Sequence, residues 1–166
     1  MIGKQIRRLP LAGAREEAAR ILGKLGIPEP ARDRYPRQLS GGMRQRVAIA
    51  RAFAVQPDIL LADEAFGHLD EVTAAELRDT FLELARECGS TAILITHQLE
   101  EAIGVGDRIV VFGKSAKLLA DIHVVQWPKS KYGLLREAIQ STLQNNRPDP
   151  RLKDPKSALK RKRAKR

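Results

Sequence analysis

LSGGMRQRVAIARA, Leu39 to Ala52, and ILLADEAFGHLD, Ile59 to Asp70, are the two stretches that decide the fold of this chain. In the first, Ser40 stands directly before apolar residues at helical spacing, so it is placed to cap a helix. In the second, four apolar residues precede Asp63 and Glu64, a pattern typical of a buried parallel strand that ends in carboxylates. A helix start and a strand end therefore both present groups suited to phosphate or metal.

The amino-acid composition is that of a globular protein. It has 166 residues, of which 43% are hydrophobic and 4% aromatic, so Leu, Ile, Val and Ala must fill the core of one ordinary domain. A single cysteine, Cys88, allows no intramolecular disulfide and fits a reducing compartment. No apolar run approaches the roughly 20 residues that span a bilayer, and the first residues lack a signal-peptide pattern. Any membrane role is therefore expected to be peripheral.

Positive charge is concentrated at the carboxyl end of the chain. The net charge is +10, and residues 147–166 hold ten Lys or Arg against two Asp, which leaves the remainder nearly neutral. Such a block is expected to stay solvated and disordered, or to bind an anionic surface such as lipid headgroups or nucleic acid. It contains no aromatic residue for stacking on bases, so it predicts only non-specific, salt-sensitive binding.

The spacing of apolar residues alternates between helical and strand-like along the chain. Apolar positions three to four residues apart predict helices over 12–25, 41–55, 71–88, about 98–103 and 132–143. Continuous apolar runs predict strands over 58–62, 92–96 and 108–112 and within 116–125. Strands and helices in alternation indicate an α/β domain with parallel strand pairing.

Four motifs, in order and at matching spacing, resemble those of ABC-transporter nucleotide-binding domains. LSGGMRQRVAIARA resembles the signature motif, ILLADE the Walker B motif and GHLD the D-loop, and His97 in LITHQLEEA resembles the switch histidine. DEAFGHLD is similar to the DEPFGALD of importers for nitrate, sulfonates and taurine. The resemblance covers about residues 9–124. It implies an α/β fold, that of a P-loop NTPase of the ABC ATPase type, with a parallel-sheet core and a helical subdomain.

For the signature region, the resemblance implies a role toward a second subunit. Ser40, Gly41 and Gly42 would contact the γ-phosphate of ATP held by the opposite subunit of a head-to-tail dimer. Glycines at a helix start let backbone N–H groups approach an oxyanion. Gln45 and Arg46 belong to the same helix, but the case for a role in the ATP site is weaker for them, because they can serve packing and solvation alone. Without the resemblance, a helix capped by Ser40 is enough to explain the same residues.

For the strand ends, the resemblance implies ATP hydrolysis with Mg²⁺. Asp63 would act through Mg²⁺, and Glu64 would polarise the attacking water. Asp70 would communicate across the dimer, and His97 would contact the γ-phosphate. This division suits the residue types, since an aspartate can hold Mg²⁺ or its water and a neighbouring glutamate can orient a water for attack.

The resemblance also implies a phosphate-binding loop, Gly-x-x-x-x-Gly-Lys-Ser/Thr (Walker A), which residues 1–166 do not contain. Gly113-Lys114-Ser115 follows a strand-like run, but Arg108 stands where the first glycine belongs, so these residues predict a turn. In the family the loop precedes the signature region. We therefore expect a truncated domain without the N-terminal strands, with an apolar strand edge and face left uncovered, that alone neither binds MgATP tightly nor hydrolyses it.

Three positions depart from the family pattern without removing a catalytic group. Ala65 replaces the usual proline, His68 replaces a small D-loop residue, and Gln98 stands where an aspartate is common.

The expected division of the chain follows the motifs. It comprises a helical subdomain with the signature motif, a RecA-like core part, a helical extension and a basic tail, at 1–56, 57–125, 126–146 and 147–166.

Three functional hypotheses follow. The first is the C-terminal part of an importer's ATP-binding subunit, cytoplasmic and peripheral on the inner face of the cell membrane. With a second ATPase subunit, a transmembrane permease and, indirectly, a solute-binding protein, it would couple ATP hydrolysis to uptake of a small anion such as nitrate, sulfonate or taurine. The second is an interaction module that completes the ATP site of an intact subunit in trans. The third is a basic protein that binds an anionic surface.

Overall fold

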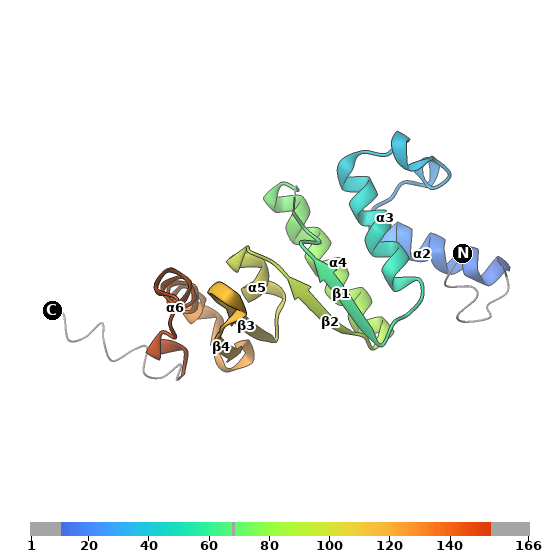
Figure 1. Ribbon diagram of the computed structural model, residues 1–166. Coiled ribbons are helices and arrows are strands. Elements are labelled where there is room, and N and C mark those ends of the chain that lie inside the picture. Colours follow the sequence, from blue (N-terminus) through green and yellow to red (C-terminus); the bar gives the residue numbers. More distant parts are fainter. Residues whose placement is uncertain (1–10, 68, 154–166) are drawn as a thin grey trace. The chain divides into compact units, whose positions relative to one another are not determined.

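The computed structural model describes residues 11–67 and 69–153 and divides the chain into two compact units, 1–97 and 98–166 (Figure 1). Each unit has a hydrophobic core of its own. Across the described ranges, none of the helices is long and apolar enough to cross a membrane.

In its described residues, the first unit combines three helices with a two-stranded sheet. Its elements are α2 (Leu11–Lys24), α3 (Gly41–Phe53), β1 (Ile59–Asp63), α4 (Glu71–Cys88) and β2 (Thr91–Ile95), with short 3-10 turns at Glu29–Ala31 and Pro36–Gln38. β1 and β2 pair in parallel, as predicted, with Leu61 opposite Ile93. Two predicted helix ends are confirmed as well. Ser40 caps the start of α3, and Gly89, with a φ of 63°, ends α4 in the left-handed conformation.

Three phenylalanines form the centre of the first core. Phe53 at the end of α3, Phe66 in the loop after β1 and Phe81 on α4 are each at most 1% exposed. The ring centroid of Phe81 lies 5.3 Å from that of Phe53 and 5.4 Å from that of Phe66, both edge to face. This is the favoured geometry for aromatic pairs, so the rings join α3, α4 and the loop after β1 into one packed body.

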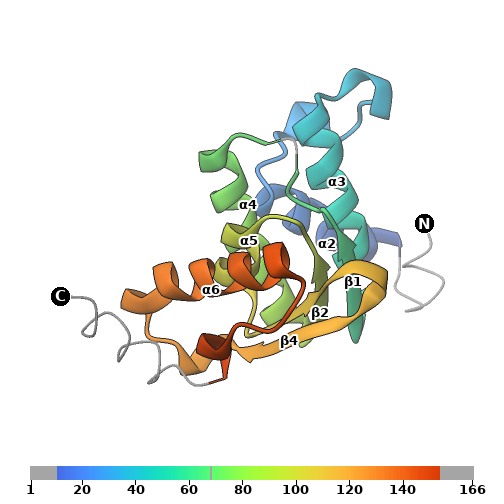
Figure 2. The same cartoon turned by 60° about the vertical axis from the view of Figure 1, so that its left-hand side comes forward.

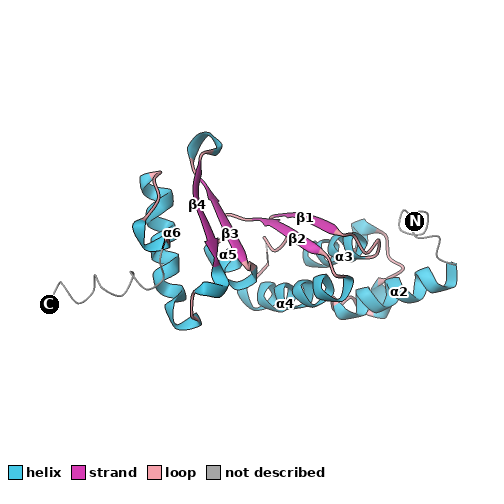
Figure 3. Cartoon of the chain, turned by 90° about the horizontal axis from the view of Figure 1, so that it is seen from below, coloured by secondary structure: helices cyan, strands magenta, loops and turns pink. Residues whose placement is uncertain are grey.

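The described residues of the first unit cover one face of the β1–β2 sheet. Leu60 is buried, and Ala62 and Leu94 pack with it on the core that includes α3 and α4. Figure 3 shows the helices of this unit on one side of the two strands. The opposite face carries large apolar side chains that are exposed to solvent: Ile59, Leu61, Ile93 and Ile95. This is the uncovered apolar face that the sequence predicts.

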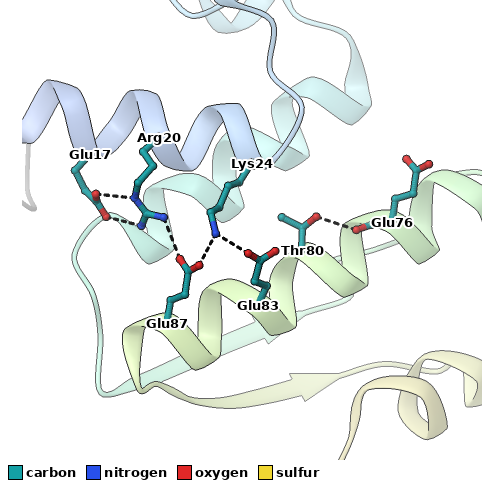
Figure 4. A network of polar contacts seen from close by, with 7 residues as sticks. All are labelled: Glu17, Arg20, Lys24, Glu76, Thr80, Glu83 and Glu87. Carbon is teal, nitrogen blue, oxygen red and sulfur yellow. Dashed lines mark hydrogen bonds and ion pairs between the residues drawn. The ribbon is translucent and has the colours of Figure 1, made fainter.

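A network of ion pairs links the outer surfaces of α2 and α4 (Figure 4). The Arg20 guanidinium pairs with Glu17 at 2.9 Å and with Glu87 at 3.0 Å. Lys24 Nζ lies 2.6 Å from Glu83 Oε1 and also pairs with Glu87. The hydrogen bonds from Lys24 and Arg20 lower the pKa of Glu87, and those from Glu83 and Glu87 raise the pKa of Lys24.

The second unit packs two helices against a β-hairpin. Its elements are α5 (Leu99–Val105), β3 (Arg108–Phe112), β4 (Leu118–His123) and α6 (Tyr132–Asn145), with short 3-10 turns at Lys114–Ala116, Val124–Gln126, Lys129–Lys131 and Pro150–Leu152. Figure 2 shows α6 running along the hairpin. Leu135 and Ile139 of α6 and Ile122 of β4 are buried in its core, and so is Trp127.

The pairing of the third predicted strand is the main correction to the sequence analysis. β3 does not extend the parallel sheet in the described residues, but pairs antiparallel with β4, with Ile109 opposite Ile122. The physical reason is the short connection, because an antiparallel partner needs only a tight turn whereas a parallel one needs a long crossover. Gly113 N donates to Lys117 O at 2.8 Å across that turn. The predicted turn at Gly113-Lys114-Ser115 is thus confirmed.

Replacing Phe81 by alanine removes the ring that contacts both other phenylalanines. We expect Phe81→Ala to lower the free energy of unfolding by about 3–5 kcal/mol, because it leaves a cavity in a packed core. Urea denaturation followed by circular dichroism measures the loss. Val72→Ala, on the exposed side of the same helix, is the control and should change stability by about 0.5 kcal/mol or less. Equal losses in the two variants would contradict this account of the core.

Replacing Glu87 by glutamine should change stability in a pH-dependent way. Because the folded-state pKa of Glu87 is lowered, its contribution is complete above the ordinary value of 4.5 and is lost as the pH falls through the lowered value. The raised pKa of Lys24 acts at the other end, since its contribution persists below 10.5 and is lost as the pH rises through the raised value. Glu87→Gln should therefore lower the Tm near neutral pH and match the parent chain in strong acid.

Thermal unfolding at both pH values, repeated in ~1 M NaCl, measures the effect. Salt should reduce the neutral-pH difference, because the pairs are exposed and the Debye length falls to ~3 Å. A difference that is the same at every pH would show that Glu87 acts through packing instead.

Candidate functional site

The candidate site lies at the carboxyl edge of the β1–β2 sheet. Asp63 is the last residue of β1 and Glu64 follows it, while His97 follows β2. The Nδ1 atom of His97 lies 2.9 Å from Glu64 Oε1, and both side chains are more than half exposed. Parallel strands end at the same edge, and this brings together a carboxylate and an imidazole that are far apart in the sequence.

Glu64 adopts a backbone conformation that is rare for a residue with a side chain. Its φ of 47° lies in the left-handed region, where steric crowding disfavours all residues but glycine. Hydrogen bonds hold the backbone in place: Glu64 N donates to Ile95 O at 2.8 Å, and Gly67 N donates to Glu64 O at 3.2 Å. Burial of Phe66 anchors the same loop. The surrounding structure thus fixes the residue that presents the carboxylate.

The signature region forms the start of α3. Ser40 Oγ accepts a hydrogen bond from Met43 N at 3.2 Å, so the serine caps the helix as predicted. Gly41 and Gly42 are the first residues of α3, where backbone N–H groups have no acceptor in a preceding turn and can serve an anion. A side chain at Gly42 would lie 3.2 Å from Leu69 Cδ2, so the helix start packs closely on the loop before α4.

Three consecutive side chains of α3 hold carbonyl groups of three different segments. Arg44 Nη1 donates to Leu39 O at 2.7 Å, and Arg46 Nη1 donates to Leu25 O at 3.0 Å. Gln45 Nε2 donates to Ala65 O, in the loop directly after Glu64. Gln45 was expected to serve packing and solvation, yet it connects the signature helix to the loop that follows Asp63 and Glu64. A bond between residues so far apart leaves no local pattern by which it could be found.

Asp70 serves a local role in the structure. Its Oδ1 accepts a hydrogen bond from Thr73 N at 3.0 Å and caps α4. The hydrogen bonds with Thr73 lower the pKa of Asp70 and keep it ionised. His68, which departs from the family pattern, is in the same loop and lies outside the described residues. At Ala65, the second departure, the backbone carbonyl accepts the hydrogen bond from Gln45.

The donor set at the strand ends suits a magnesium ion that arrives with phosphate. Asp63 and Glu64 offer carboxylate oxygens, which Mg²⁺ prefers, and Mg²⁺ typically takes one or two carboxylates together with phosphate oxygens and water. Among the described residues, these strand ends included, no three His, Cys, Asp or Glu side chains gather as a metal-binding group, so the protein offers the ion only part of its ligands. The residues therefore fit Mg²⁺ as a companion of nucleotide.

Removing the amide of Gln45 should loosen the loop after β1. Gln45→Ala leaves the Ala65 carbonyl without this donor, and we expect faster hydrogen exchange over 64–70 with a loss of about 1–2 kcal/mol in stability. Hydrogen exchange read by mass spectrometry measures it. Gln140→Ala, at an exposed position of α6, is the matched control and should leave exchange over 64–70 unchanged. Unchanged exchange in both variants would show that Gln45 does not hold the loop.

Comparisons with known proteins place these motifs in a family. Residues 3–67 match the family model described as ABC transporter. The sulfate/thiosulfate import ATP-binding protein CysA of Nocardia farcinica is 46% identical over 112 residues, which are 68% of this chain and 34% of that protein. The aliphatic sulfonates import ATP-binding protein SsuB 1 of Burkholderia cenocepacia is 41% identical over 119 residues, 72% of this chain and 37% of that protein. The chain thus spans about a third of the length of these relatives.

Solved structures give the same assignment. The dimeric ATP-binding cassette MJ0796, in a post-hydrolysis state bound to ADP and Pi, matches with a TM-score of 0.62 and 33% identity, covering 70% of this chain and 49% of that one. Sequence and fold therefore agree: the chain belongs to the ABC transporter ATP-binding family, with the P-loop NTPase fold in its matched region, and ATP-binding proteins of importers are its homologues.

Proposed function

We propose that the chain supplies the signature and Walker B motifs of an importer subunit that couples ATP hydrolysis to the uptake of a small anion, such as nitrate, a sulfonate or taurine. The observation that carries this proposal is the contact between Glu64 and His97 at the end of β1 and β2. The relatives named for sulfate/thiosulfate and sulfonate import support the class of solute.

The roles of the site residues follow from their positions. Ser40, Gly41 and Gly42, at the positive end of the α3 dipole, contact the γ-phosphate of ATP that the opposite subunit of a head-to-tail dimer holds. Ser40 and Gly41 are exposed, so this end of the helix is accessible to a second subunit. Asp70 caps the helix that follows the D-loop and communicates across the same dimer interface.

Three side chains act at the strand ends, each with a different role. Asp63 holds Mg²⁺, which would supply charge neutralisation to the phosphates. Glu64 orients and polarises the water that attacks the γ-phosphate, and its fixed left-handed backbone keeps the carboxylate in one place. His97, hydrogen-bonded to that carboxylate, restricts its rotation and offers the ring as a contact for the γ-phosphate.

Residues 1–166 by themselves are proposed to lack hydrolysis. They contain no Gly-x-x-x-x-Gly-Lys-Ser/Thr, the loop whose backbone N–H groups and lysine neutralise the phosphates. ATP therefore has to be held by a phosphate-binding loop outside residues 1–166, and the chain acts with a transmembrane permease at the inner face of the cell membrane. The division at 1–56, 57–125, 126–146 and 147–166 describes the parts that the motifs assign to this work.

A second candidate is the interaction module that completes an intact subunit's ATP site in trans. The exposed start of α3 favours it, because the module needs only the signature residues and no hydrolysis at Glu64. The third hypothesis, binding of the basic tail to an anionic surface, rests on composition, since most of the tail lies outside the described residues.

An ATPase assay tests the proposed function. The chain is mixed with a full-length sulfonate-importer subunit whose own signature serine is replaced, so that only Ser40 can complete an ATP site. We expect no turnover by the chain alone, turnover in the mixture, and a loss of about 10²-fold with Ser40→Ala, because one donor to the γ-phosphate is removed.

Two further variants separate chemistry from folding. Ser40→Asp preserves a helix cap but places a negative charge beside the phosphate, so it should also abolish turnover while leaving the helix intact. Ser115→Ala, in the turn after β3, is the matched control and should leave turnover unchanged. Hydrolysis by the chain alone, or turnover in the mixture that is insensitive to Ser40, would refute the proposal.

A further inference from the structure

The side chain of Gln45 joins two parts of the candidate site that have different roles in the proposed function. It lies in α3, whose first residues contact the ATP of the opposite subunit, and its Nε2 donates a hydrogen bond to Ala65 O. Ala65 directly follows Glu64, which acts on water in the site of its own subunit. Neither the phosphate contact nor the activation of water uses this hydrogen bond, so its position between the two calls for a role of its own.

The geometry of α3 makes Gln45 sensitive to what binds at the start of the helix. Gly41 is the first residue of α3 and Gln45 comes four residues later, so the two lie on the same face, about 6 Å apart along the helix axis. The far end of α3 is anchored in the core by Ile49, Ala50 and Phe53, which are buried. A ligand that displaces the first turn therefore also moves the side chain of Gln45.

The loop after β1 has little freedom to absorb such a movement. It contacts α3 at Ala65, through Gln45, and at Leu69, whose Cδ2 lies 3.2 Å from the position of a side chain added to Gly42. Within the loop, Glu64 has a φ of 47°, and its backbone N donates to Ile95 O at 2.8 Å. A shift of the Ala65 carbonyl therefore acts on the backbone of the adjacent Glu64.

The neighbours of Gln45 on α3 do not make this connection. Arg44 Nη1 donates to Leu39 O at 2.7 Å, and Arg46 Nη1 donates to Leu25 O at 3.0 Å. Both carbonyls belong to segments that precede α3, whereas the bond from Gln45 reaches the end of the sheet. An amide also provides this donor without a charge, which suits a half-buried position.

We propose that Gln45 is a positioning residue that couples the two parts of the site: ATP bound at the start of α3 changes the conformation of the loop at Glu64 through the hydrogen bond from Gln45 to Ala65. The inference rests on the proposed function, because it requires ATP at the start of α3. Gln45 touches no substrate and acts through Ala65. Such coupling is reciprocal, so the state of the loop at Glu64 changes the affinity of the signature residues for ATP by the same factor.

A purely structural role for Gln45 makes a different prediction. A bond that only stabilises the loop would, when removed, raise the exchange of the loop amides with and without ATP alike. Coupling requires in addition that the response of the loop to ATP disappears. The response is therefore measured as the ratio of exchange rates without and with nucleotide.

Hydrogen exchange read by mass spectrometry tests the inference. The 166-residue chain is mixed with the importer subunit whose own signature serine is replaced, and the probe is a non-hydrolysable ATP analogue with Mg²⁺. In the parent chain we expect the analogue to slow exchange about threefold or more over 40–44 and over 64–67. In Gln45→Ala the slowing over 40–44 should persist, and the slowing over 64–67 should be lost.

Three further variants separate coupling from stability. Gln45→Glu keeps the shape of the side chain but only accepts hydrogen bonds when ionised, so it should lose the response over 64–67. Gln45→Lys keeps an N–H donor and should restore it. Ser90→Ala is the matched control, because Ser90 Oγ donates to Pro57 O at 2.5 Å at the other end of the same two strands. It removes a comparable bond and should leave the response unchanged.

The outcomes distinguish this inference from the proposed function. A response over 64–67 that survives Gln45→Ala, or that Ser90→Ala removes as fully, would overturn the inference, and so would a response that Gln45→Lys fails to restore. Slowing over 40–44 without any response over 64–67 in the parent chain would contradict the inference alone. No slowing over 40–44 would contradict the proposed function, and with it the coupling.

Discussion

The edge-to-face packing of Phe66 and Phe53 on Phe81 holds the candidate site in place. Phe66 lies two residues after Glu64, so its burial between α3 and α4 fixes the loop that presents the carboxylate. The left-handed backbone of Glu64 is tolerated because these contacts and the hydrogen bonds of its backbone over-determine the conformation. Gln45 adds a direct tie from the signature helix to the same loop. Chemistry at a polar, exposed edge thus depends on packing in an apolar core.

A second constraint is that β1 and β2 have the continuous apolar sequence of strands buried on both faces, while the described residues of the first unit cover one face. The strands that carry the site are therefore also the strands that need a partner.

Local patterns were sufficient to predict much of this structure. Helical spacing and caps located α3 and α4, because Ser40 and Gly89 satisfy backbone groups within a few residues. Apolar runs located β1 and β2, and their parallel pairing accounts for the meeting of Glu64 with His97. The predicted parallel pairing of β3 was wrong, because the sequence of a strand does not indicate whether its partner runs parallel or antiparallel. Three other features depend on tertiary packing and could not be predicted from the sequence. They are the hydrogen bond from Gln45 to Ala65, the phenylalanine cluster and the ion pairs between α2 and α4.

In the proposed function, the signature residues of this chain contact ATP that is held by the opposite subunit. Amide chemical shifts of Ser40, Gly41 and Gly42 in the isotope-labelled chain report that contact directly. On addition of a non-hydrolysable ATP analogue with Mg²⁺, the account predicts changes at these amides only when an unlabelled, intact importer subunit is present. Equal changes in the chain alone, or none in the mixture, would contradict it.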